Sequence, residues 1–345
     1  MAALEDDIDQ LADETGFSGV IRVDNEQGLV LAKAYGMAHR ALQVPNTVDT
    51  QFGLASAVKG MTAIAVVSLV VDGILELSTP ARSVLGSDLP LIGDDVTIEH
   101  LLSHRSGIGD YLDEDAGYDI ADYMMPVPVS QLATTEQFLT VLDGHQTKFP
   151  AGEQFSYCNG GFVVLALIAE RVSGVPFHDL IDDRVCMPAG MVDTAFLRSD
   201  ELPGRAALGY LTVDGAVRTN LLHLPVRGNG DGGIYSTVAD IRSFWLAFCD
   251  GRLVHSEWVT EMVRPRSVIS DRERYGLGFW LQGAGEGTGD ALRLEGYDAG
   301  VSFRSWHHPA RRLTHTVISN TSDDQGAAWP LTKLLYERLS TAAPD

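Results

Sequence analysis

The chain has little cysteine, little positive charge and no long apolar run. Its 345 residues include three cysteines, Cys158, Cys186 and Cys249, which are widely spaced and form no C-x-x-C pair. This usage argues against a disulfide framework and a thiolate zinc site, and it favours free thiols in a reducing compartment. The 25 basic residues are outnumbered by 47 acidic ones, for a net charge of −22. Nucleic acid and anionic membrane surfaces are therefore poor partners.

The sequence carries no evident signal for export or membrane insertion. The first residues are acidic, where a signal peptide carries positive charge, and no apolar segment follows them. The longest apolar run, residues 61–71, is much shorter than the ~20 residues that cross a bilayer. We therefore expect a cytoplasmic protein with no transmembrane segment.

The order of the apolar patterns predicts the organisation of the fold. A helix-compatible run from about Ser56 to Asp72 opens a middle region with helical periodicity that continues to about Pro225. Short β-rich runs flank this region, at 19–23 and 28–32 before it and at 275–281, 301–306 and 313–319 after it. The fold class that follows is α/β (α+β). We expect residues 1–60 and 231–345 to form one domain, a mostly α-helical insert at 61–230, and an active site in the cleft between them.

Ser56 and Lys59 form a candidate nucleophile and base at the start of the apolar helix. Their spacing of three residues places both side chains on one helical face, within reach of a hydrogen bond. A serine hydroxyl becomes a good nucleophile when a base removes its proton, and a lysine with a pKa lowered by burial can be that base. The N–H groups at the helix start also lie where an oxyanion would form.

Tyr157 and Asn159 form a second candidate pair, just before another apolar helix that begins near Phe162. A tyrosine beside a cationic group can relay a proton, and an asparagine amide can hold a substrate carbonyl or the lysine ammonium. The simpler alternative is a half-buried tyrosine with a capping asparagine.

Other patterns favour structural interpretations. His100 and His104 have the i, i+4 spacing of a metal pair but lack the glutamate of a His-Glu-x-x-His motif. His307 and His308 are expected at the surface or in packing. The glycine-dense stretch 228–233 lacks the context of a phosphate loop and predicts turns.

Taken in order, these residues resemble the class C branch of the serine β-lactamase and penicillin-binding-protein superfamily, which includes DD-carboxypeptidases, D-aminopeptidases and family VIII esterases. The landmarks that match its motifs are Ser56-x-x-Lys59, Leu-Leu-Ser-His-Arg-Ser-Gly at 101–107, Phe-Pro-Ala-Gly at 149–152, Tyr157-Cys-Asn159, Cys-Met-Pro-Ala-Gly-Met at 186–191 and Gly-Gly-Ile-Tyr-Ser-Thr-Val-Ala-Asp at 232–240. The resemblance implies a β-lactamase/transpeptidase-like fold with an antiparallel sheet and flanking helices.

The third motif of that superfamily, Lys-Thr-Gly or His-x-Gly, is altered in this chain. By position it falls on Leu294-Glu295-Gly296, so the cation is missing. The resemblance implies that Gly296 admits a substrate and that the N–H groups of Ser56 and Tyr297 form the oxyanion hole. Asp298, next to the motif, is expected to attract a substrate amine or to serve as an acidic turn residue.

Leu294 puts strong recognition of a substrate carboxylate in doubt. Two arginines on neighbouring stretches, Arg293 and Arg304, are candidates to replace the missing cation. Strand alternation alone leaves open whether Arg293 faces the cleft or solvent.

The resemblance implies a serine hydrolase, without cofactor or metal, that forms an acyl-enzyme on Ser56. Lys59 and Tyr157 would share the proton transfers, with a cationic Lys59 lowering the pKa of Tyr157, and Asn159 would orient the carbonyl. We expect an esterase or small amidase acting on a small-molecule ester, amide or lactone, with β-lactams as acylating ligands. The alternatives are a D-stereospecific peptidase or DD-carboxypeptidase, a weak β-lactamase, and a non-catalytic binding or filament-forming scaffold.

Overall fold

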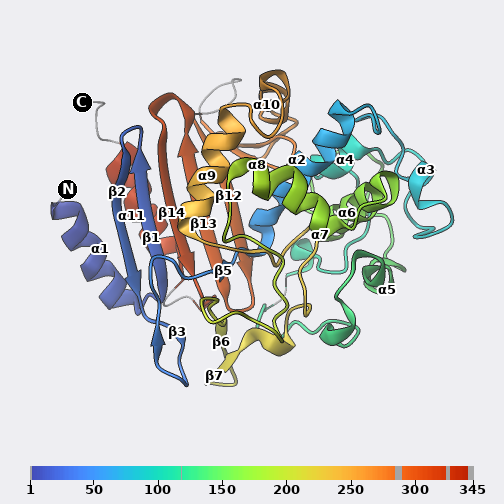
Figure 1. Ribbon diagram of the computed structural model, residues 1–345. Coiled ribbons are helices and arrows are strands. Elements are labelled where there is room, and N and C mark those ends of the chain that lie inside the picture. The colour runs from blue at the N-terminus through green and yellow to red at the C-terminus, as the bar shows by residue number, and fades with distance from the viewer. Residues whose placement is uncertain (1, 118, 284–289, 324–326, 341–345) are drawn as a thin grey trace.

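An eight-stranded antiparallel sheet forms the frame of the molecule (Figure 1). The computed structural model describes all residues except 1, 118, 284–289, 324–326 and 341–345. The strand order is β2-β1-β14-β13-β12-β11-β10-β9, so strands from the two ends of the chain meet at β1 and β14. The strands are β1 (Gly19–Asn25), β2 (Gly28–Tyr35), β9 (Ser267–Val268), β10 (Glu273–Tyr275), β11 (Trp280–Gln282), β12 (Ala291–Asp298), β13 (Val301–His308) and β14 (Leu313–Ser319).

Helices cover both faces of this sheet. On one face, α1 packs with α11, and on the other α9 contacts β1 and β14 (Figure 1). The alternation of strand side chains divides the core accordingly, because Ile21 and Val317 belong to the α1 and α11 side, whereas Val20 and Ile318 belong to the other. The helices are α1 (Ala2–Thr15), α2 (Val58–Val71), α3 (Arg82–Leu85), α4 (Ile98–Leu102), α5 (Leu139–Leu142), α6 (Asn159–Ser173), α7 (Phe177–Ile181), α8 (Met187–Ala189), α9 (Val238–Cys249), α10 (Ser256–Met262) and α11 (Trp329–Ser340).

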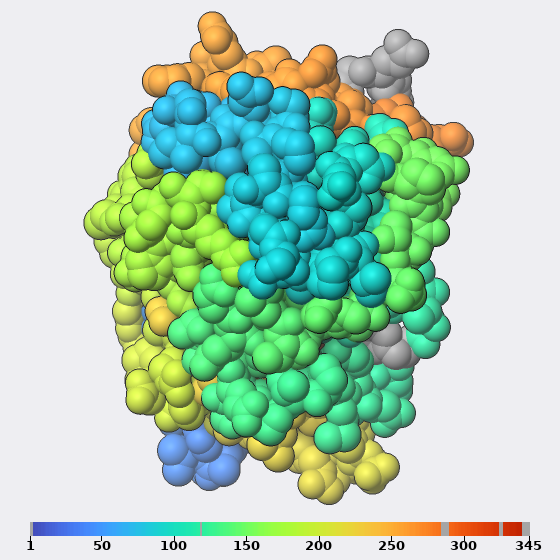
Figure 2. Space-filling model, turned by 90° about the vertical axis from the view of Figure 1, so that its right-hand side faces the viewer, coloured from blue at the N-terminus to red at the C-terminus, as the bar shows by residue number. Residues whose placement is uncertain are grey.

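The middle of the chain forms the helical region beside the sheet. Its surface, coloured light blue to green, makes up most of the side of the molecule shown in Figure 2. The short strands in and around it are β3 (Met37–His39), β4 (Val44–Pro45), β5 (Phe52–Gly53), β6 (Tyr210–Val213), β7 (Ala216–Thr219) and β8 (Tyr235–Ser236). The strands of the large sheet all fall within 1–60 and 231–345, while the division into two domains stays a prediction.

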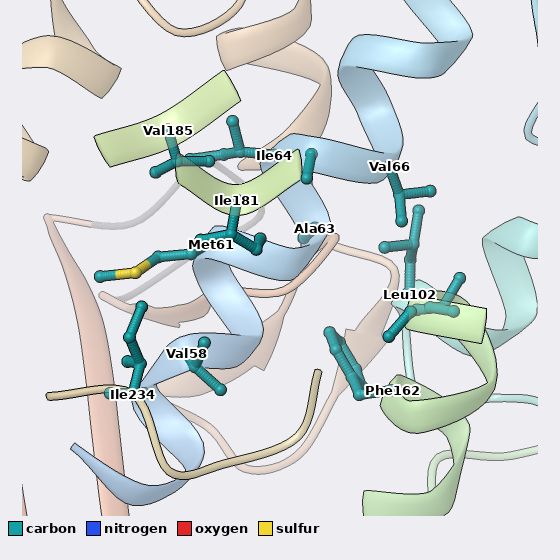
Figure 3. Close-up of a cluster of buried hydrophobic side chains, with 14 of the residues drawn as sticks. Val58, Met61, Ala63, Ile64, Val66, Leu102, Phe162, Ile181, Val185 and Ile234 are labelled. Carbon is teal, nitrogen blue, oxygen red and sulfur yellow. The ribbon is translucent and has the colours of Figure 1, made fainter. Parts of the chain in front are cut away.

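Helix α2 lies at the centre of the main core and explains why its sequence is apolar on every side. Met61 and Ile64 face Ile181 and Val185 of the segment after α6, while Val66 lies toward Leu102 (Figure 3). A helix that is buried all round needs no polar face. Within the described ranges, no single helix is long and apolar enough to cross a membrane. Helix α6 and segment 177–189 meet that criterion only jointly, and they are bent by 89° relative to each other.

The sequence correctly predicted the strands at 19–23, 28–32 and 313–319, but the single strand expected at 275–281 was wrong. The chain makes two strands there, β10 and β11, separated at Gly278. Gly278 has φ +83°, and a Cβ at this position would lie 2.3 Å from the Cβ of Ala63 in α2. The close approach of the hairpin to α2 therefore requires glycine and interrupts the strand.

Candidate active site

Ser56 lies in the tight turn that leads into α2. The turn is a 3₁₀ segment, Ala55–Ala57, and Ala55 adopts a left-handed φ of +46°. Strand β12 passes directly over it, since a Cβ at Gly296 would lie 2.0 Å from the oxygen of Leu54 and 3.0 Å from the nitrogen of Ser56. Only glycine fits at position 296, so the backbone of β12 approaches the serine closely.

Lys59 lies one helical turn after Ser56 and its ammonium group is buried against three acceptors. Nζ is 2.9 Å from Oγ of Ser56, 2.8 Å from Oδ1 of Asn159 and 2.7 Å from the backbone oxygen of Asp231. The side chain is 2% exposed. Burial lowers the pKa of Lys59, although nearby carboxylates, Asp231 first among them, oppose the shift.

Asn159 is held from several sides at the first turn of α6. Its backbone N–H donates to Oδ2 of Asp110 at 2.6 Å, and the N–H of Gly160 donates to Oδ1 of the same carboxylate at 2.8 Å. Its Nδ2 donates to the oxygen of Leu112 at 3.0 Å and to Oε1 of Glu114 at 3.1 Å. The side-chain oxygen is thereby turned toward Lys59.

Tyr157 packs as a buried ring beside this cluster. Its ring lies 4.9 Å from Nζ of Lys59 and 4.2 Å from the ring of His104. Burial raises the pKa of Tyr157 well above its ordinary value, Glu114 adds to the rise, and a hydrogen bond with Ser56 opposes it. The direction is the opposite of the lowering expected from Lys59, because desolvation by burial has the largest effect on this pKa.

At the altered third motif, Leu294 and Arg293 are buried, whereas Arg304 on the next strand lines the cleft. Leu294 is 2% exposed and packs on α2, with one methyl 2.6 Å from where a Cβ of Gly60 would lie. Arg293 is 6% exposed and paired with Glu273 and Glu295, so it faces neither the cleft lining nor solvent. Of the two candidate arginines, only Arg304 lines the cleft.

Carboxylates gather on the other side of Ser56. The carboxylate of Asp231 accepts a hydrogen bond from the hydroxyl of Tyr111 and is 7% exposed. Burial raises the pKa of Asp298 to about 7 and that of Asp110 to about 6. This acidic surrounding partly offsets the desolvation of Lys59.

Two cavities meet at Ser56. The wide one, about 890 Å³, is lined by residues that include Tyr157, Trp280 and Arg304. The narrow one, about 60 Å³, is lined by residues that include Asn159 and Asp298 together with apolar side chains from 221–226. When a substrate carbonyl lies at Ser56, the two parts of the substrate on either side of it can therefore occupy cavities with different linings.

The structure brings the predicted residues together and adds others that sequence reasoning missed. Ser56, Lys59, Asn159 and Tyr157 form one cluster, and Gly296, Tyr297 and Asp298 line the cavities around it. Asp110, Glu114 and Asp231 were not predicted as site residues. A signal existed for Asp231, because it lies in the glycine-dense stretch 228–233 interpreted only as turns.

The two histidines with metal-pair spacing have structural contacts. His100 completes the capping box of α4 with Thr97, and Nδ1 of His104 accepts the N–H of Cys158 at 3.1 Å. Within the part of the chain that the structure describes, no group of three or more His, Cys, Asp or Glu side chains is arranged to hold a metal ion.

Comparisons with known proteins identify similar proteins, all related to one family. Residues 4–336 match the family model described as Beta-lactamase. The chain is 33% identical to the esterase EstB of Burkholderia gladioli over 216 residues, covering 61% of this chain and 54% of the esterase. It is 28% identical to a D-aminopeptidase of Brucella anthropi over 342 residues, covering 96% of this chain and 61% of that protein. The chain thus spans between half and two thirds of these relatives' lengths.

A solved structure matches over almost the full length of both chains. The crystal structure of a penicillin binding protein from Bacillus halodurans has a TM-score of 0.88 and 34% sequence identity. The match covers 95% of this chain and 99% of that one.

Proposed function

This chain belongs to the beta-lactamase family, and from that membership and the site geometry we propose that it is a serine hydrolase that forms an acyl-enzyme on Ser56. The observation that carries the proposal is the contact of Lys59 Nζ with Ser56 Oγ at 2.9 Å inside a buried polar cluster. A buried amine with a lowered pKa next to a serine hydroxyl is an arrangement that activates the nucleophile.

The contacts of Lys59 fit the role of a base. In its neutral form the amine has two N–H groups, which Asn159 Oδ1 and the oxygen of Asp231 accept, and one lone pair, which faces Ser56 Oγ. Ser56 then attacks the substrate carbonyl while its proton moves to Lys59. The N–H groups of Ser56 and Tyr297 hold the oxyanion.

Collapse of the tetrahedral intermediate requires a proton on the leaving group. Tyr157 keeps its proton at neutral pH because its pKa is raised, and it lines the wide cavity beside Ser56. It donates this proton as the bond to the leaving group breaks, and Lys59 restores it. Water then attacks the acyl-enzyme by the reverse transfers and releases Ser56.

We assign an esterase or small-amidase activity on small esters, amides or lactones, with β-lactams as acylating ligands. A D-stereospecific peptidase is the second candidate, and the acidic lining of the narrow cavity favours it. Asp231 and Asp298 lie where an ammonium group on the acyl part of a substrate would be attracted. The D-aminopeptidase relative is consistent with this candidate.

A substrate panel tests these assignments. Purified protein and its Ser56→Ala variant are assayed with p-nitrophenyl esters, D-amino-acid amides, the same amides N-acetylated, and a chromogenic cephalosporin. Hydrolysis of the esters by the wild type but not by Ser56→Ala supports the esterase assignment. A preference for amides with a free amine over the N-acetylated ones supports the peptidase. If no substrate turns over and a phosphonate probe leaves no adduct on Ser56, the protein is a non-catalytic scaffold and the proposal is wrong.

A further inference from the structure

Trp280 brings an aromatic ring to the wall of the wide cavity. Its position follows from the register of the sheet, in which Trp280 of β11 pairs with Arg293 of β12, and Arg293 pairs with Trp306 of β13. Residues paired in this way project from the same face of a sheet, so the three side chains form a row. Arg293 lies 5.0 Å from the ring centroid of Trp280 and 5.1 Å from that of Trp306. Of the three, Trp280 alone lines the cavity.

The ring of Trp280 is fixed by other aromatic rings. Tyr275 meets it edge to face with the ring centroids 5.0 Å apart, and Phe155 does so at 6.1 Å. The ring of Tyr157 is nearly parallel to it, with an angle of 16° between the planes and the centroids 6.2 Å apart. Because the indole is already held in place, little conformational freedom is lost when a ligand stacks on it.

The other indole at this cavity is already covered. Arg304, which itself lines the cavity, lies over the ring of Trp329 at 4.2 Å from the centroid. Its Nε donates to Oε2 of Glu295 at 2.9 Å, which holds the guanidinium there. Arg293, in contrast, is buried and does not line the cavity, so it leaves the side of Trp280 that faces the cavity open. Trp280 is therefore the indole on which a ligand can stack.

We propose that Trp280 binds a neutral aromatic ring on the leaving group of the substrate. Stacking of two aromatic rings stabilises a complex beyond the burial of their apolar area. A cationic ring fits less well, because Arg293 lies against the same indole and would repel a second cation. An anionic ring also fits less well, because the cavity lining carries the carboxylates of Glu114, Asp119 and Glu295 against one guanidinium.

The cavity that Trp280 lines is the one that receives the leaving group. Tyr157, the proton donor of the proposed function on which this inference rests, lines the wide cavity and not the narrow one. The leaving atom must lie on the side of its donor. A ring attached to that atom therefore enters the space that Tyr157 and Trp280 border together. At about 890 Å³, this cavity has room for an aromatic ring and its substituents.

The substrate class that follows is an ester or amide whose leaving alcohol or amine carries a neutral aromatic ring. Ser56 Oγ forms the new ester bond to the acyl carbon as the bond to the leaving oxygen or nitrogen breaks. That atom takes the proton from Tyr157, and the aromatic product then leaves Trp280. Water later takes the acyl group, so no other reactant is needed.

A matched pair of esters tests the inference. Benzyl acetate and cyclohexylmethyl acetate share the acyl group and have leaving alcohols of similar size and acidity, but only the benzyl ring is aromatic. Trp280→Leu should lower the ratio of their kcat/KM values, benzyl over cyclohexylmethyl, by about two- to tenfold, the range that stacking of two rings supplies. Lost packing against Tyr157 lowers both rates alike and leaves the ratio unaffected. A Trp280→Leu variant with the wild-type ratio overturns the inference.

Two further variants sharpen the result. Trp280→Phe keeps a smaller aromatic ring and should retain most of the wild-type ratio. Trp306→Phe alters the ring on the other side of Arg293, which does not line the cavity, and should leave the ratio unchanged. A ratio that falls equally in Trp306→Phe and Trp280→Leu would show an effect transmitted through Arg293, and it would overturn the stacking site.

Binding measurements separate this inference from the proposed function. The Ser56→Ala protein is titrated with N-benzylacetamide and with N-(cyclohexylmethyl)acetamide, while NMR follows the indole N–H signals of the five tryptophans. Trp280→Phe identifies the signal of Trp280. The ring current of the benzyl group should shift this signal more than those of the other tryptophans, and the benzyl amide should have the lower Kd.

This outcome supports the stacking site even if no ester is hydrolysed. A Trp280 signal that N-benzylacetamide leaves unchanged, or equal Kd values for the two amides, overturns the site even in an active enzyme.

Discussion

The cluster around Ser56 and the face of β13 and β14 that carries His308 and His315 both bury titratable groups. They differ in how many hydrogen bonds these groups make. Around Ser56, Lys59 and Asn159 have a hydrogen-bond partner for each polar atom described, and burial raises the pKa of Asp110 to about 6. On the other face, His308 and His315 stack with their ring centroids 5.7 Å apart, and neither ring nitrogen of His315 has a hydrogen-bond partner. Burial lowers the pKa of His315 to about 3 and that of His308 to about 4.

This difference shows how one protein uses buried polarity for two purposes. The groups around Ser56 are held by many hydrogen bonds, and their charge states can change when a proton is transferred. The histidines are kept neutral and pack as rings beside Trp306 and Tyr336. Substitutions near Ser56 should therefore change catalysis, whereas substitutions among the histidines should change stability and its dependence on pH.

The largest effect is expected from Ser56→Ala. Loss of Oγ removes the atom that we propose becomes acylated, so hydrolysis should fall by about three or more powers of ten while the fold is retained. Initial rates and a thermal melting curve measure the two properties. Mass spectrometry of the wild type with a phosphonate should find the adduct on Ser56, and an adduct on another serine would contradict the assignment.

Lys59→Ala and Tyr157→Phe should each lower kcat by about two or more powers of ten, and the double variant should be little worse than either. The reason is that, in the proposed mechanism, both side chains act in one chain of proton transfers. Steady-state kinetics of the three variants provides the cycle. Losses that multiply would mean that the two residues serve separate steps.

Asp110→Asn should have an intermediate effect on kcat, about ten- to a hundredfold, because one amide oxygen cannot replace both carboxylate oxygens that hold α6. Asp110 also raises the pKa of Lys59, so removing its charge should lower that pKa. The acid limb of the kcat profile should then move to lower pH.

The control for this variant is Asp113→Asn, which removes a carboxylate paired with Lys148 outside the cluster. It should leave the acid limb in place. A limb that moves to higher pH in Asp110→Asn, or does not move, would show that Asp110 does not act through Lys59.

The smallest effect is expected on stability, from His315→Leu. Below pH 6.5 the unfolded chain protonates this histidine and the folded chain does not, so the wild type loses stability as the pH falls toward 3. Between pH 7.5 and 5.0 the loss is about 2 kcal/mol. The variant should lack that part of the loss, because leucine does not titrate.

Denaturant unfolding at pH 7.5 and 5.0 measures this difference. Asp110 and Asp298 contribute with the opposite sign, since their raised folded pKa values favour the folded state as the pH falls, but they do so equally in both proteins. Substitution of the exposed His255 by Gln should leave the wild-type dependence. An identical pH dependence in His315→Leu would mean that His315 is already solvated in the folded state.

The sequence predicted those parts of the site that depend on local spacing. Ser56 and Lys59 share one helical turn, and Tyr157 and Asn159 flank the start of α6, so the residues and the apolar helices after them could be identified together. Asp110 and Asp231 reach the cluster from segments far apart in the chain, which no periodicity encodes. The pKa direction of Tyr157 was mispredicted because it depends on burial.

The position of Arg304 could have been derived more fully. A two-residue turn at Ala299 and Gly300 pairs Asp298 with Val301, and counting outward along the hairpin pairs Glu295 with Arg304. What the count does not give is the ring of Trp329, which comes from α11 and fixes the plane of the guanidinium.

The adjacency of β1 and β14 dictates an order of events during synthesis. A nascent chain emerging from the ribosome presents β1 well before its partner, residues 313–319, has been made. Until β14 is translated, β1 keeps an unpaired edge and two apolar faces exposed, so a chain stalled before residue 313 is the species most prone to aggregate or to need a chaperone.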